Sequence, residues 1–235
     1  MKKTIVLSLG GSLIVPEKMK ANFLIKFVKT LRKHYKTHKF VVVCGGGVIA
    51  RKYISALKAE NRPHKELAEA GIRATRMNAQ FIMQMFTRKE ANDSLPTTMK
   101  QVKSALAKNN VVICGALRFA LNSTSDSTAA QLAHHLKTEF INLTNVHGLY
   151  DKDPKKHKNA KFIPLISWDK FLSMANKIKF EHGQNFILDQ NAAKIIKKHK
   201  ISTYLLGPKL NNLSKVLNGK KFKGTLIGGQ DDNSL

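Results

Sequence analysis

The sequence predicts an α/β fold: a three-layer α/β/α sandwich around a mainly parallel sheet. Short apolar runs rich in β-branched residues, without polar alternation, indicate strands that are buried on both faces. Between these runs, apolar residues recur every three or four positions, which is typical of amphipathic helices. Strands that alternate with helices form parallel sheets covered by helices on both sides. The expected strands occupy residues 4–9, 40–44, 111–114, 140–144, 201–206 and 225–227.

Helices are expected between these strands. The first opens at Pro16 and Glu17 and buries a stripe at four-residue spacing, formed by Phe23, Phe27, Leu31 and Tyr35. A long helix to about Arg88 has a second stripe, which core packing explains first and an oligomer interface second. That stripe consists of Leu67, Ala70, Ala74, Met77, Phe81 and Met85. Shorter helices are expected over 48–58, 97–108, 128–137, 168–175, 192–199 and 213–217.

Polar residues are expected to cap three of these helices. Asp126 or Ser127 precedes the helix at 128–137, Ser167 precedes the one at 168–175, and Asp189 precedes the one at 192–199. Side-chain oxygens at such positions accept hydrogen bonds from the free N–H groups of the first turn.

The composition fits one folded domain. The 235 residues are 43% hydrophobic and include only six prolines, which argues against disorder. We expect a single domain over residues 1–229 and a frayed polar tail at 230–235. The lysines preceding the apolar stretch before Val15 resemble a signal peptide, but Gly10, Gly11 and Pro16-Glu17 argue against one. No run approaches 18 apolar residues, so no membrane partner is expected.

The charge is strongly positive. The chain has 41 Lys and Arg against 15 Asp and Glu, a net charge of +26. Nonspecific nucleic-acid association is one interpretation, and a basic bias of the whole proteome is another, which we prefer because the lysines are scattered. Such a field also accelerates the arrival of anionic substrates.

Cysteine and histidine point to no metal site. Cys44 and Cys114 end two expected buried strands and belong to no CxxC motif, so two inert thiols in a reduced, cytoplasmic protein are expected. His34 and His38 lie four residues apart but among lysines, which indicates a solvated helix face. His134 and His135 cannot face one ligand from a helix.

Glycine turns follow the expected strands. Gly45, Gly46 and Gly47 follow one strand, precede a helix and lie near Arg51, while Gly10 and Gly11 follow another strand. A helix starting at such a turn presents free N–H groups to an anion, and an arginine adds a planar fork of donors. Taken alone, three glycines also fit an ordinary tight turn. Because parallel strands end on one side, however, these turns should gather with the polar segment at 122–126 and bind two phosphate-bearing ligands.

The motifs follow one another in a known order. They are Ser8-Leu9-Gly10-Gly11-Ser12, Gly45-Gly46-Gly47 with Arg51, Gly71 to Ala79, Ser123-Thr124-Ser125-Asp126, Thr144 to Lys155, and Leu188 to Ile196. This series resembles the amino-acid-kinase superfamily, most closely its archaeal-type uridylate kinases, over roughly residues 3 to 229.

The resemblance implies a reaction and two halves. It implies transfer of the γ-phosphoryl group of ATP, with Mg²⁺, to UMP, giving UDP in pyrimidine nucleotide biosynthesis. Residues 1–140 would form the acceptor-binding half and 141–229 the ATP-binding half, in a hexamer built as a trimer of dimers. It places ATP at Gly10, Gly11, Ser12, Gly47, Arg51, Thr144, Tyr150 and Asp153. It places UMP at Gly45, Gly46, Asn122, Ser123, Thr124 and Ser125, and makes Arg51 and Asp126 the catalytic candidates.

Elementary chemistry agrees with these assignments. Phosphoryl transfer requires in-line placement of two anions and neutralisation of their repulsion, which backbone N–H groups, an arginine and Mg²⁺ provide. Thr124 and Ser125 can donate to the acceptor phosphate, and Asp126 can fix the turn, position a lysine or metal, or simply cap a helix. Tyr150 offers a flat face for adenine, or is a half-buried loop aromatic. Asp153 can accept from ribose hydroxyls, or serve the turn before Pro154.

Four positions depart from the family pattern. Ser8 replaces a lysine that many members have and that archaeal uridylate kinases also tend to lack, and Ala68 replaces an acidic residue expected near the UMP ribose. His147 replaces the acidic residue of an Asn-Val-Asp-Gly turn, and the acceptor loop at 117–123 lacks a Pro-Gly. Three of these four changes lie at the acceptor side or in the phosphate-transfer region. A sibling kinase acting on isopentenyl phosphate or a carboxylate is therefore the main alternative, and a degenerate, basic RNA-associated relative is the non-enzymatic one.

Overall fold

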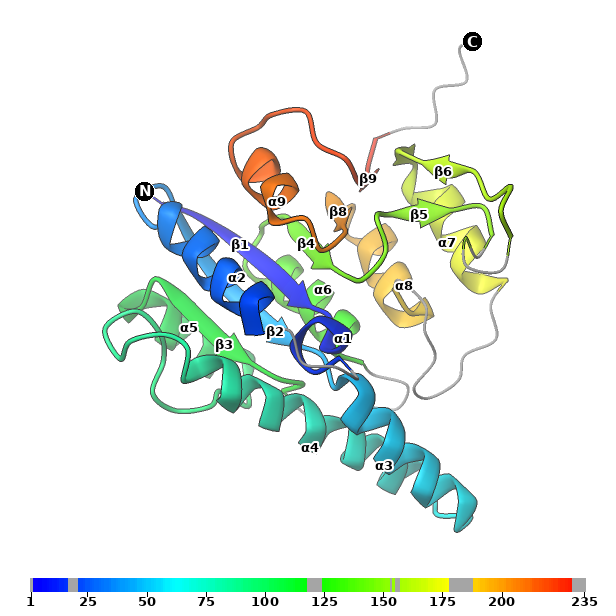
Figure 1. Ribbon diagram of the computed structural model, residues 1–235, viewed down its shortest axis with the longest axis horizontal. Coiled ribbons are helices and arrows are strands. Elements are labelled where there is room, and N and C mark those ends of the chain that lie inside the picture. The colour runs from blue at the N-terminus through cyan, green and yellow to red at the C-terminus, as the bar shows by residue number, and fades with distance from the viewer. Residues whose placement is uncertain are drawn as a thin grey trace.

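A seven-stranded sheet organises the molecule (Figure 1). The computed structural model describes residues 2–16, 21–117, 124–152, 154, 157–177 and 188–229. The sheet order is β3 (Val111–Cys114), β2 (His38–Cys44), β1 (Lys3–Leu9), β4 (Phe140–Leu143), β8 (Thr203–Leu206), β9 (Thr225–Ile227) and β7 (Leu165–Ile166). The first five strands are mutually parallel, and β9 runs antiparallel to β8. The prediction of a mainly parallel sheet is confirmed.

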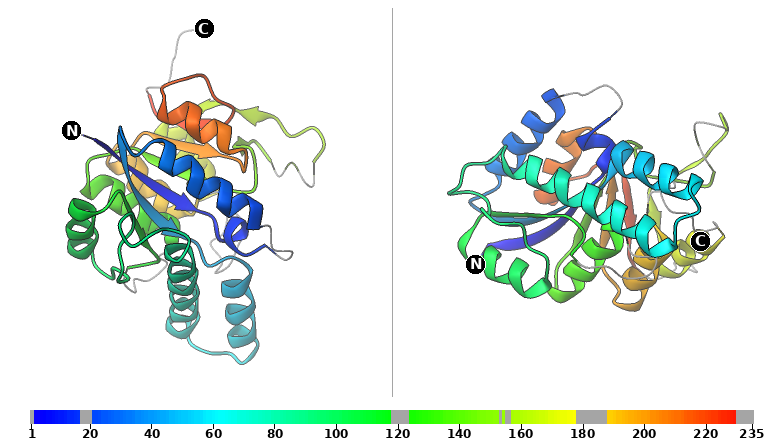
Figure 2. Two further views of the ribbon diagram at one scale, coloured as in Figure 1. Left: turned by 60° about the vertical axis from the view of Figure 1, so that its left-hand side comes forward. Right: turned by 90° about the horizontal axis from the view of Figure 1, so that it is seen from below.

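Helices cover both faces of this sheet (Figure 1, Figure 2). Alternate residues of β1 enter different cores: Ile5 and Leu7 pack with α2 (Ala21–Lys33) and α9 (Leu210–Leu217), whereas Val6 belongs to the opposite core. The first core also takes residues from α4 (His64–Met83) and from α1 (Gly11–Ile14). The opposite core takes them from α5 (Met99–Lys108), α6 (Ser125–His135), α7 (Trp168–Asn176) and α8 (Gln190–Lys198). The predicted three layers are therefore present.

Two parts of the fold project from these layers. Helix α3 (Gly47–Ala59) and the first half of α4 form an antiparallel hairpin that extends from the body in Figure 1 and in the left view of Figure 2. In the expected stripe of α4, Leu67, Ala70 and Ala74 are buried but Met77 is 43% exposed, and Tyr53 of α3 is 53% exposed. The short strands β5 (Leu149–Tyr150) and β6 (Phe162–Ile163) form a separate antiparallel pair that sequence reasoning missed.

Several expected boundaries are wrong. The N-terminal segment forms the short helix α1 directly at Gly11, and Pro16 is not helical. Helix α2 is described from Ala21, and the predicted start at Glu17 lies outside the described residues. The long helix ends at Met83, not near Arg88. Helix α6 starts at Ser125, three residues earlier than predicted, because Thr124 and not Asp126 or Ser127 is its N-cap. The caps Ser167 and Asp189 are confirmed.

The histidines at the end of α2 are not solvated, contrary to the prediction. His34 and His38 are each only 7% exposed, and their rings meet edge to face with centroids 5.9 Å apart. The helix ends at Lys33, so His34 lies in the following turn and His38 opens β2, which carries both rings into the core. His38 Nδ1 lies 2.8 Å from the Thr37 hydroxyl, and His34 Nε2 lies 3.4 Å from the Ser214 hydroxyl.

The two thiols are buried, as expected. Cys44 and Cys114 end the neighbouring strands β2 and β3, are fully inaccessible, and form no disulfide. Burial raises the pKa of Cys114 to about 12 and raises that of Cys44 well above its usual value. A thiol that stays protonated is a poor nucleophile and metal ligand, so neither cysteine has chemistry to offer.

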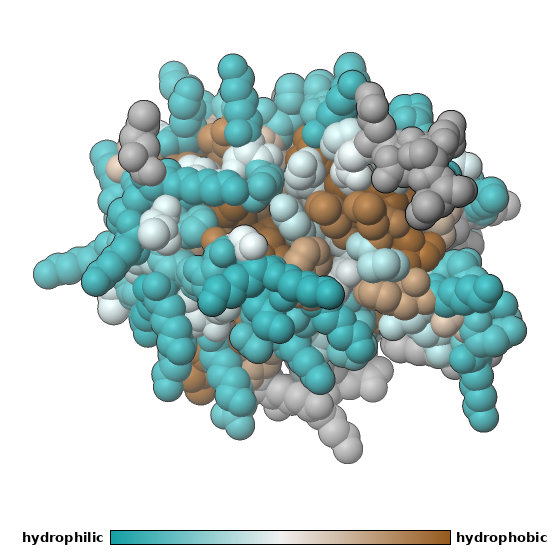
Figure 3. All heavy atoms as spheres, turned by 90° about the horizontal axis from the view of Figure 1, so that it is seen from above, coloured by the Kyte–Doolittle hydropathy of each residue, from teal (hydrophilic) through white to brown (hydrophobic). Residues whose placement is uncertain are grey.

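The outer surface agrees with the composition. Seen from above, long hydrophilic side chains project around the whole outline, and an apolar area occupies part of the middle (Figure 3). Within the described residues, no helix combines the length and the apolar character that crossing a bilayer requires.

Candidate functional site

The carboxyl ends of five parallel strands meet at one edge of the sheet. In sheet order these ends are followed by Gly115, Gly45, Gly10, Thr144 and Gly207. The order reverses between β1 and β4: β2 and β3 lie on one side of this point, and β8 lies on the other. In open parallel sheets, ligands bind outside the strand ends at such a switch point.

Two glycine turns touch at this switch point. A Cβ atom on Gly11 would lie 2.0 Å from the backbone nitrogen of Gly47, and one on Gly45 would lie 2.6 Å from that of Gly11. Gly47 also has a φ of +63°, in the left-handed region that favours glycine. The two predicted phosphate-binding turns are therefore in direct backbone contact, and no side chain fits between them.

Helix α4 holds the turns in place from one side. The Asn78 side-chain amide donates to the carbonyl oxygens of Gly45, at 2.7 Å, and Gly46, at 3.2 Å. One turn earlier, the Thr75 hydroxyl accepts from the backbone N–H of Ala116 at 2.9 Å. Sequence reasoning assigned no role to either residue. Their signal was present, because both are polar residues within the apolar stripe of an amphipathic helix and are buried.

The N-terminus of α6 approaches the same place from the other face. Thr124 caps the helix and accepts from the backbone N–H groups of Asp126 and Ser127, both at 3.2 Å. The Asp126 side chain is thereby free of the capping role and instead accepts from the hydroxyl of Ser8, on β1, at 2.6 Å. The amide of Asn142, on β4, lies 3.5 Å from the same carboxylate oxygen. Asp126 therefore faces the two strands that flank the switch point.

A second carboxylate joins α6 to α8. Asp189 is 6% exposed and accepts from the backbone N–H groups of Asn191, at 2.8 Å, and Ala192, at 3.0 Å. Its other oxygen accepts from the hydroxyl of Thr124. The N-termini of α6 and α8 are thus linked by one side-chain hydrogen bond. The sequence predicted the capping role of Asp189 but not this link, which joins residues far apart in the chain.

Burial raises the pKa of both carboxyl groups. The pKa of Asp126 rises to about 7, mainly through burial of the carboxyl and further through the nearby Asp189 charge, against the opposing hydrogen bond from Ser8. Burial also raises the pKa of Asp189, while the hydrogen bond from Thr124 and those from the α8 backbone oppose that rise. Near neutral pH, Asp126 therefore titrates in the functional range, which is typical of groups at active sites.

This titration predicts a pH-dependent stability. The folded-state pKa of Asp126 lies above its ordinary 3.8. The contribution of this group to the free energy of unfolding is therefore fully present below about pH 4 and is lost as pH rises through about 7. Asp126→Asn keeps an acceptor for Ser8 and removes the charge. Between pH 5 and 8, we expect the free energy of unfolding of the wild type to fall by about 1 to 3 kcal/mol relative to the variant. Urea unfolding across this range measures it, with the exposed Asp93→Asn as control, and equal pH slopes for wild type and Asp126→Asn would contradict it.

Arg51 lies one turn into α3, behind the glycine turns. Its side chain is half-buried, and it makes no hydrogen bond or ion pair with any other residue in the described part of the chain. Four other arginines in that part do have such partners: Arg32, Arg62, Arg73 and Arg76. A half-buried guanidinium without a carboxylate partner at a helix N-terminus is suited to a phosphate ligand.

The predicted adenosine residues lie on the β4 and β8 side of the switch point. Thr144 follows β4 directly, and its backbone N–H donates to Leu206 of β8 at 2.9 Å. Tyr150 lies on β5, half-buried, with its ring edge-on to Phe162 at 5.4 Å. His147, which departs from the family pattern, packs against Gly207. Asp153 falls outside the described residues, as do Asn122 and Ser123 of the predicted acceptor loop.

The remaining predicted residues fit one arrangement. Gly46 lies against Ala50 and helix α4, and Ser12 is half-buried in α1 beside the turns. Thr124 and Ser125 stand at the start of α6. Among the described residues, no group of three His, Cys, Asp or Glu side chains could hold a metal. The site therefore gathers backbone donors, helix N-termini, one arginine and two buried carboxyl groups, which suits polyphosphate ligands.

This chain is similar to proteins of one family. The model of the Amino acid kinase family matches residues 3–207. A uridylate kinase from Thermoplasma volcanium is 34% identical over 228 residues, 97% of this chain and 98% of that protein. One from Thermococcus kodakarensis is 33% identical over 225 residues, 95% of this chain and 98% of that protein.

Solved structures agree with these sequence matches. The crystal structure of uridylate kinase from Archaeoglobus fulgidus matches with a TM-score of 0.83 and 31% identity, covering 97% of this chain and 100% of that one. A UMP kinase structure from Ureaplasma parvum has a TM-score of 0.78 at 21% identity, which supports the fold alone.

Proposed function

Because this chain belongs to the amino acid kinase family, we propose that it transfers the γ-phosphoryl group of ATP to UMP, giving UDP and ADP. The observation that carries the proposal is the similarity to uridylate kinases, which runs through nearly the full length of the chain and includes the site. The contact between the two glycine turns gives this similarity a chemical meaning, because it brings the backbones of both turns together at the switch point, where their N–H groups can serve phosphates.

The sheet order supports a division into two halves. Strands β1, β2 and β3, from residues 1–140, lie on one side of the switch point, and β4, β8, β9 and β7, from residues 141–229, lie on the other. UMP would bind beside Gly45, Gly46 and the start of α6, and the adenosine of ATP beside Thr144 and Tyr150. The phosphates of both nucleotides would then meet at the two glycine turns that follow β1 and β2.

The chemistry follows from this placement. The transferred phosphoryl group passes between two anions, so catalysis consists mainly of holding them in line and compensating their charge. Backbone N–H groups at Gly11 and Gly47 and the guanidinium of Arg51 would supply fixed positive potential at the transferred group. Ser125 would orient the acceptor phosphate, whereas the Thr124 hydroxyl, predicted for the same role, already donates its proton to Asp189. Asp126 would fix the end of β1 against α6 through Ser8.

Mg²⁺ belongs to the same proposal. This ion is usually held by one or two carboxylates together with substrate phosphates, not by an all-protein cage. Asp126 is the candidate carboxylate for that role, because both oxygens of Asp189 already accept hydrogen bonds within the protein. When bound, Mg²⁺ would offset the negative charge of the phosphates.

A hexamer assembled as a trimer of dimers completes the proposal. The exposed Tyr53 on the projecting α3–α4 hairpin and the exposed Met77 in the second half of α4 are suited to self-association. Size-exclusion chromatography with light scattering tests the mass in solution.

The direct test is a substrate panel. ADP release is measured with Mg²⁺-ATP and each nucleoside monophosphate, and with isopentenyl phosphate as the alternative acceptor. We expect kcat/KM for UMP to exceed that for AMP or GMP by at least about a hundredfold, since a site built to hydrogen-bond one base rejects others strongly. Preference for isopentenyl phosphate would establish the sibling kinase. Absence of both ATP binding and turnover would instead favour the non-enzymatic relative.

A further inference from the structure

The edge of the sheet opposite the nucleotide site has two adjoining basic hollows. One, of about 540 Å³, is lined by the first residues of β1 and by residues that precede β4 and β8. The other, of about 600 Å³, is lined by residues at and before the starts of β1 and β2. The hollows share Lys3, and their lysines are Lys2, Lys3, Lys36, Lys137 and Lys200, which we call the basic rim. Of the described residues that line either hollow, Glu139 alone is acidic, and it pairs with Lys3 at 2.8 Å.

Two lysines of the basic rim have an unusual backbone. Lys137 follows α6 and Lys200 follows α8, with φ angles of +51° and +49°. Each ends its helix in the same way: Lys137 N–H donates to His134 at 3.1 Å and Thr138 N–H to Ala133 at 2.9 Å, and Lys200 N–H and Ile201 N–H repeat the pattern on α8. Glycine is the usual residue at this position.

Helix capping does not explain these lysines. A cation near a helix C-terminus is favourable, but any residue of the last turn can supply it without a left-handed backbone. Neither the Lys137 nor the Lys200 ammonium makes a hydrogen bond or ion pair with other described residues. Because α6 and α8 lead into the adjacent parallel strands β4 and β8, the two lysines occupy equivalent places on one surface.

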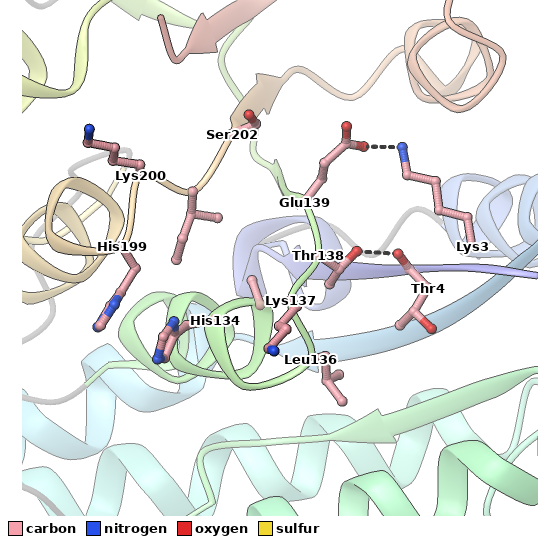
Figure 4. A pocket seen from close by; sticks show the side chains of 12 residues that line it. Lys3, Thr4, His134, Leu136, Lys137, Thr138, Glu139, His199, Lys200 and Ser202 are labelled. Atoms are coloured by element: carbon pink, nitrogen blue, oxygen red, sulfur yellow. Dashed lines mark hydrogen bonds and ion pairs between the residues drawn. The ribbon is translucent and has the colours of Figure 1, made fainter.

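The surroundings of the hollow of about 540 Å³ fit a chain of phosphates. His134 and His199 lie with their rings stacked, centroids 3.5 Å apart, beside Lys137 and Lys200 (Figure 4). Hydroxyl-bearing Ser202 and Thr138 line the same hollow. Aromatic faces next to a cationic groove are the features on which single-stranded nucleic acids bind. None of the large apolar side chains found exposed in the described part lines either hollow, which disfavours insertion into a membrane.

We propose that the basic rim binds the phosphodiester backbone of single-stranded RNA, on the edge opposite the nucleotide site. The proposal does not depend on the proposed kinase activity. It gives the five lysines of the basic rim, which are part of the strongly positive charge of the chain, a specific function. The two hollows offer successive positions for neighbouring phosphates around the shared Lys3.

The test uses the double variant Lys137→Gly/Lys200→Gly. Glycine suits the backbone at both positions, so the variant removes two charges without threatening the fold, and its melting temperature should equal or exceed that of the wild type. The matched control is Lys58→Gln/Lys65→Gln, which removes two exposed lysines from the α3–α4 hairpin. Fluorescence anisotropy measures binding of a labelled mixed-sequence RNA of about 12 nucleotides over a range of NaCl concentrations.

We expect the glycine variant to bind RNA about tenfold more weakly, with a log–log salt slope reduced by about 1.4, as loss of two phosphate contacts requires. Control and wild type should bind alike, and kcat for phosphoryl transfer should be unchanged in both variants. Equal losses in variant and control would overturn the proposal by showing diffuse attraction. No RNA binding by the wild type at low salt, or tighter binding to phosphatidylserine vesicles than to RNA, would also overturn it.

Discussion

Gly11→Ala is expected to abolish most of the activity and to destabilise the protein. The added methyl group would lie 2.0 Å from the backbone nitrogen of Gly47, where no flexible side chain can move aside. The turns after β1 and β2 must then separate, at a cost of about 3 kcal/mol in the free energy of unfolding. A displacement of about 1 Å at the transferred phosphoryl group lowers kcat/KM by about a hundredfold.

Urea unfolding and steady-state kinetics measure the two effects. The matched control is Gly228→Ala, whose added methyl group would have its nearest neighbour at 3.7 Å, an ordinary contact. That variant should stay within about 0.5 kcal/mol of the wild type in stability and keep its activity. If Gly11→Ala proved as active and as stable as Gly228→Ala, the close contact of the two turns would be disproved.

The second large effect is expected for Arg51→Ala. Removing a guanidinium that stabilises a transferring phosphoryl group lowers kcat by at least about tenfold and by up to about a thousandfold. Because Arg51 has no bonded partner among the described residues, the free energy of unfolding should change by less than about 0.5 kcal/mol. Arg51→Ala should therefore lose activity while keeping its stability, whereas Gly11→Ala should lose both.

Two companion variants sharpen the test of Arg51. Arg51→Lys keeps the charge but loses the planar fork of donors, so it should recover only part of the rate. Lys52→Ala removes the adjacent exposed lysine and should leave kcat unchanged. An unchanged kcat for Arg51→Ala, or equal losses for Arg51→Ala and Lys52→Ala, would remove Arg51 from the catalytic machinery.

The layered fold could be predicted because its signals are local and repeated. Unbroken apolar runs such as Val41 to Val43 gave the parallel strands, and the stripes of the helices gave the two covering layers. The two-residue strands β5, β6 and β7 lack such a pattern. A strand at 225–227 was predicted and is present as β9, but its antiparallel direction was not predicted. The pairing of these strands depends on contacts across the chain, such as the hydrogen bond from Leu149 N–H to Thr225.

The site was predictable as a set of turns but not as a network. The glycines that follow strands predict tight turns, and Asp189, which precedes a helix, predicts an N-cap. By contrast, Thr124 and Asp126 could not be assigned from spacing, since several polar residues in a row can each cap the same helix. Likewise, His34 and His38 are buried because α2 ends before them, at Lys33. The neighbouring lysines led to the wrong prediction of a solvated helix face. The bonds of Asn78 to Gly45 and of Thr124 to Asp189 require the tertiary structure.

The two buried thiols allow local unfolding of this protein to be measured. Cys44 and Cys114 lie at the ends of adjacent strands, where solvent has no access and where the reactive thiolate is suppressed. An alkylating reagent can therefore reach them only when β2 and β3 come apart. The rate of labelling then reports how often β2 and β3 separate in the native protein, without an engineered probe. It does so at the strands that support the glycine turn at 45–47.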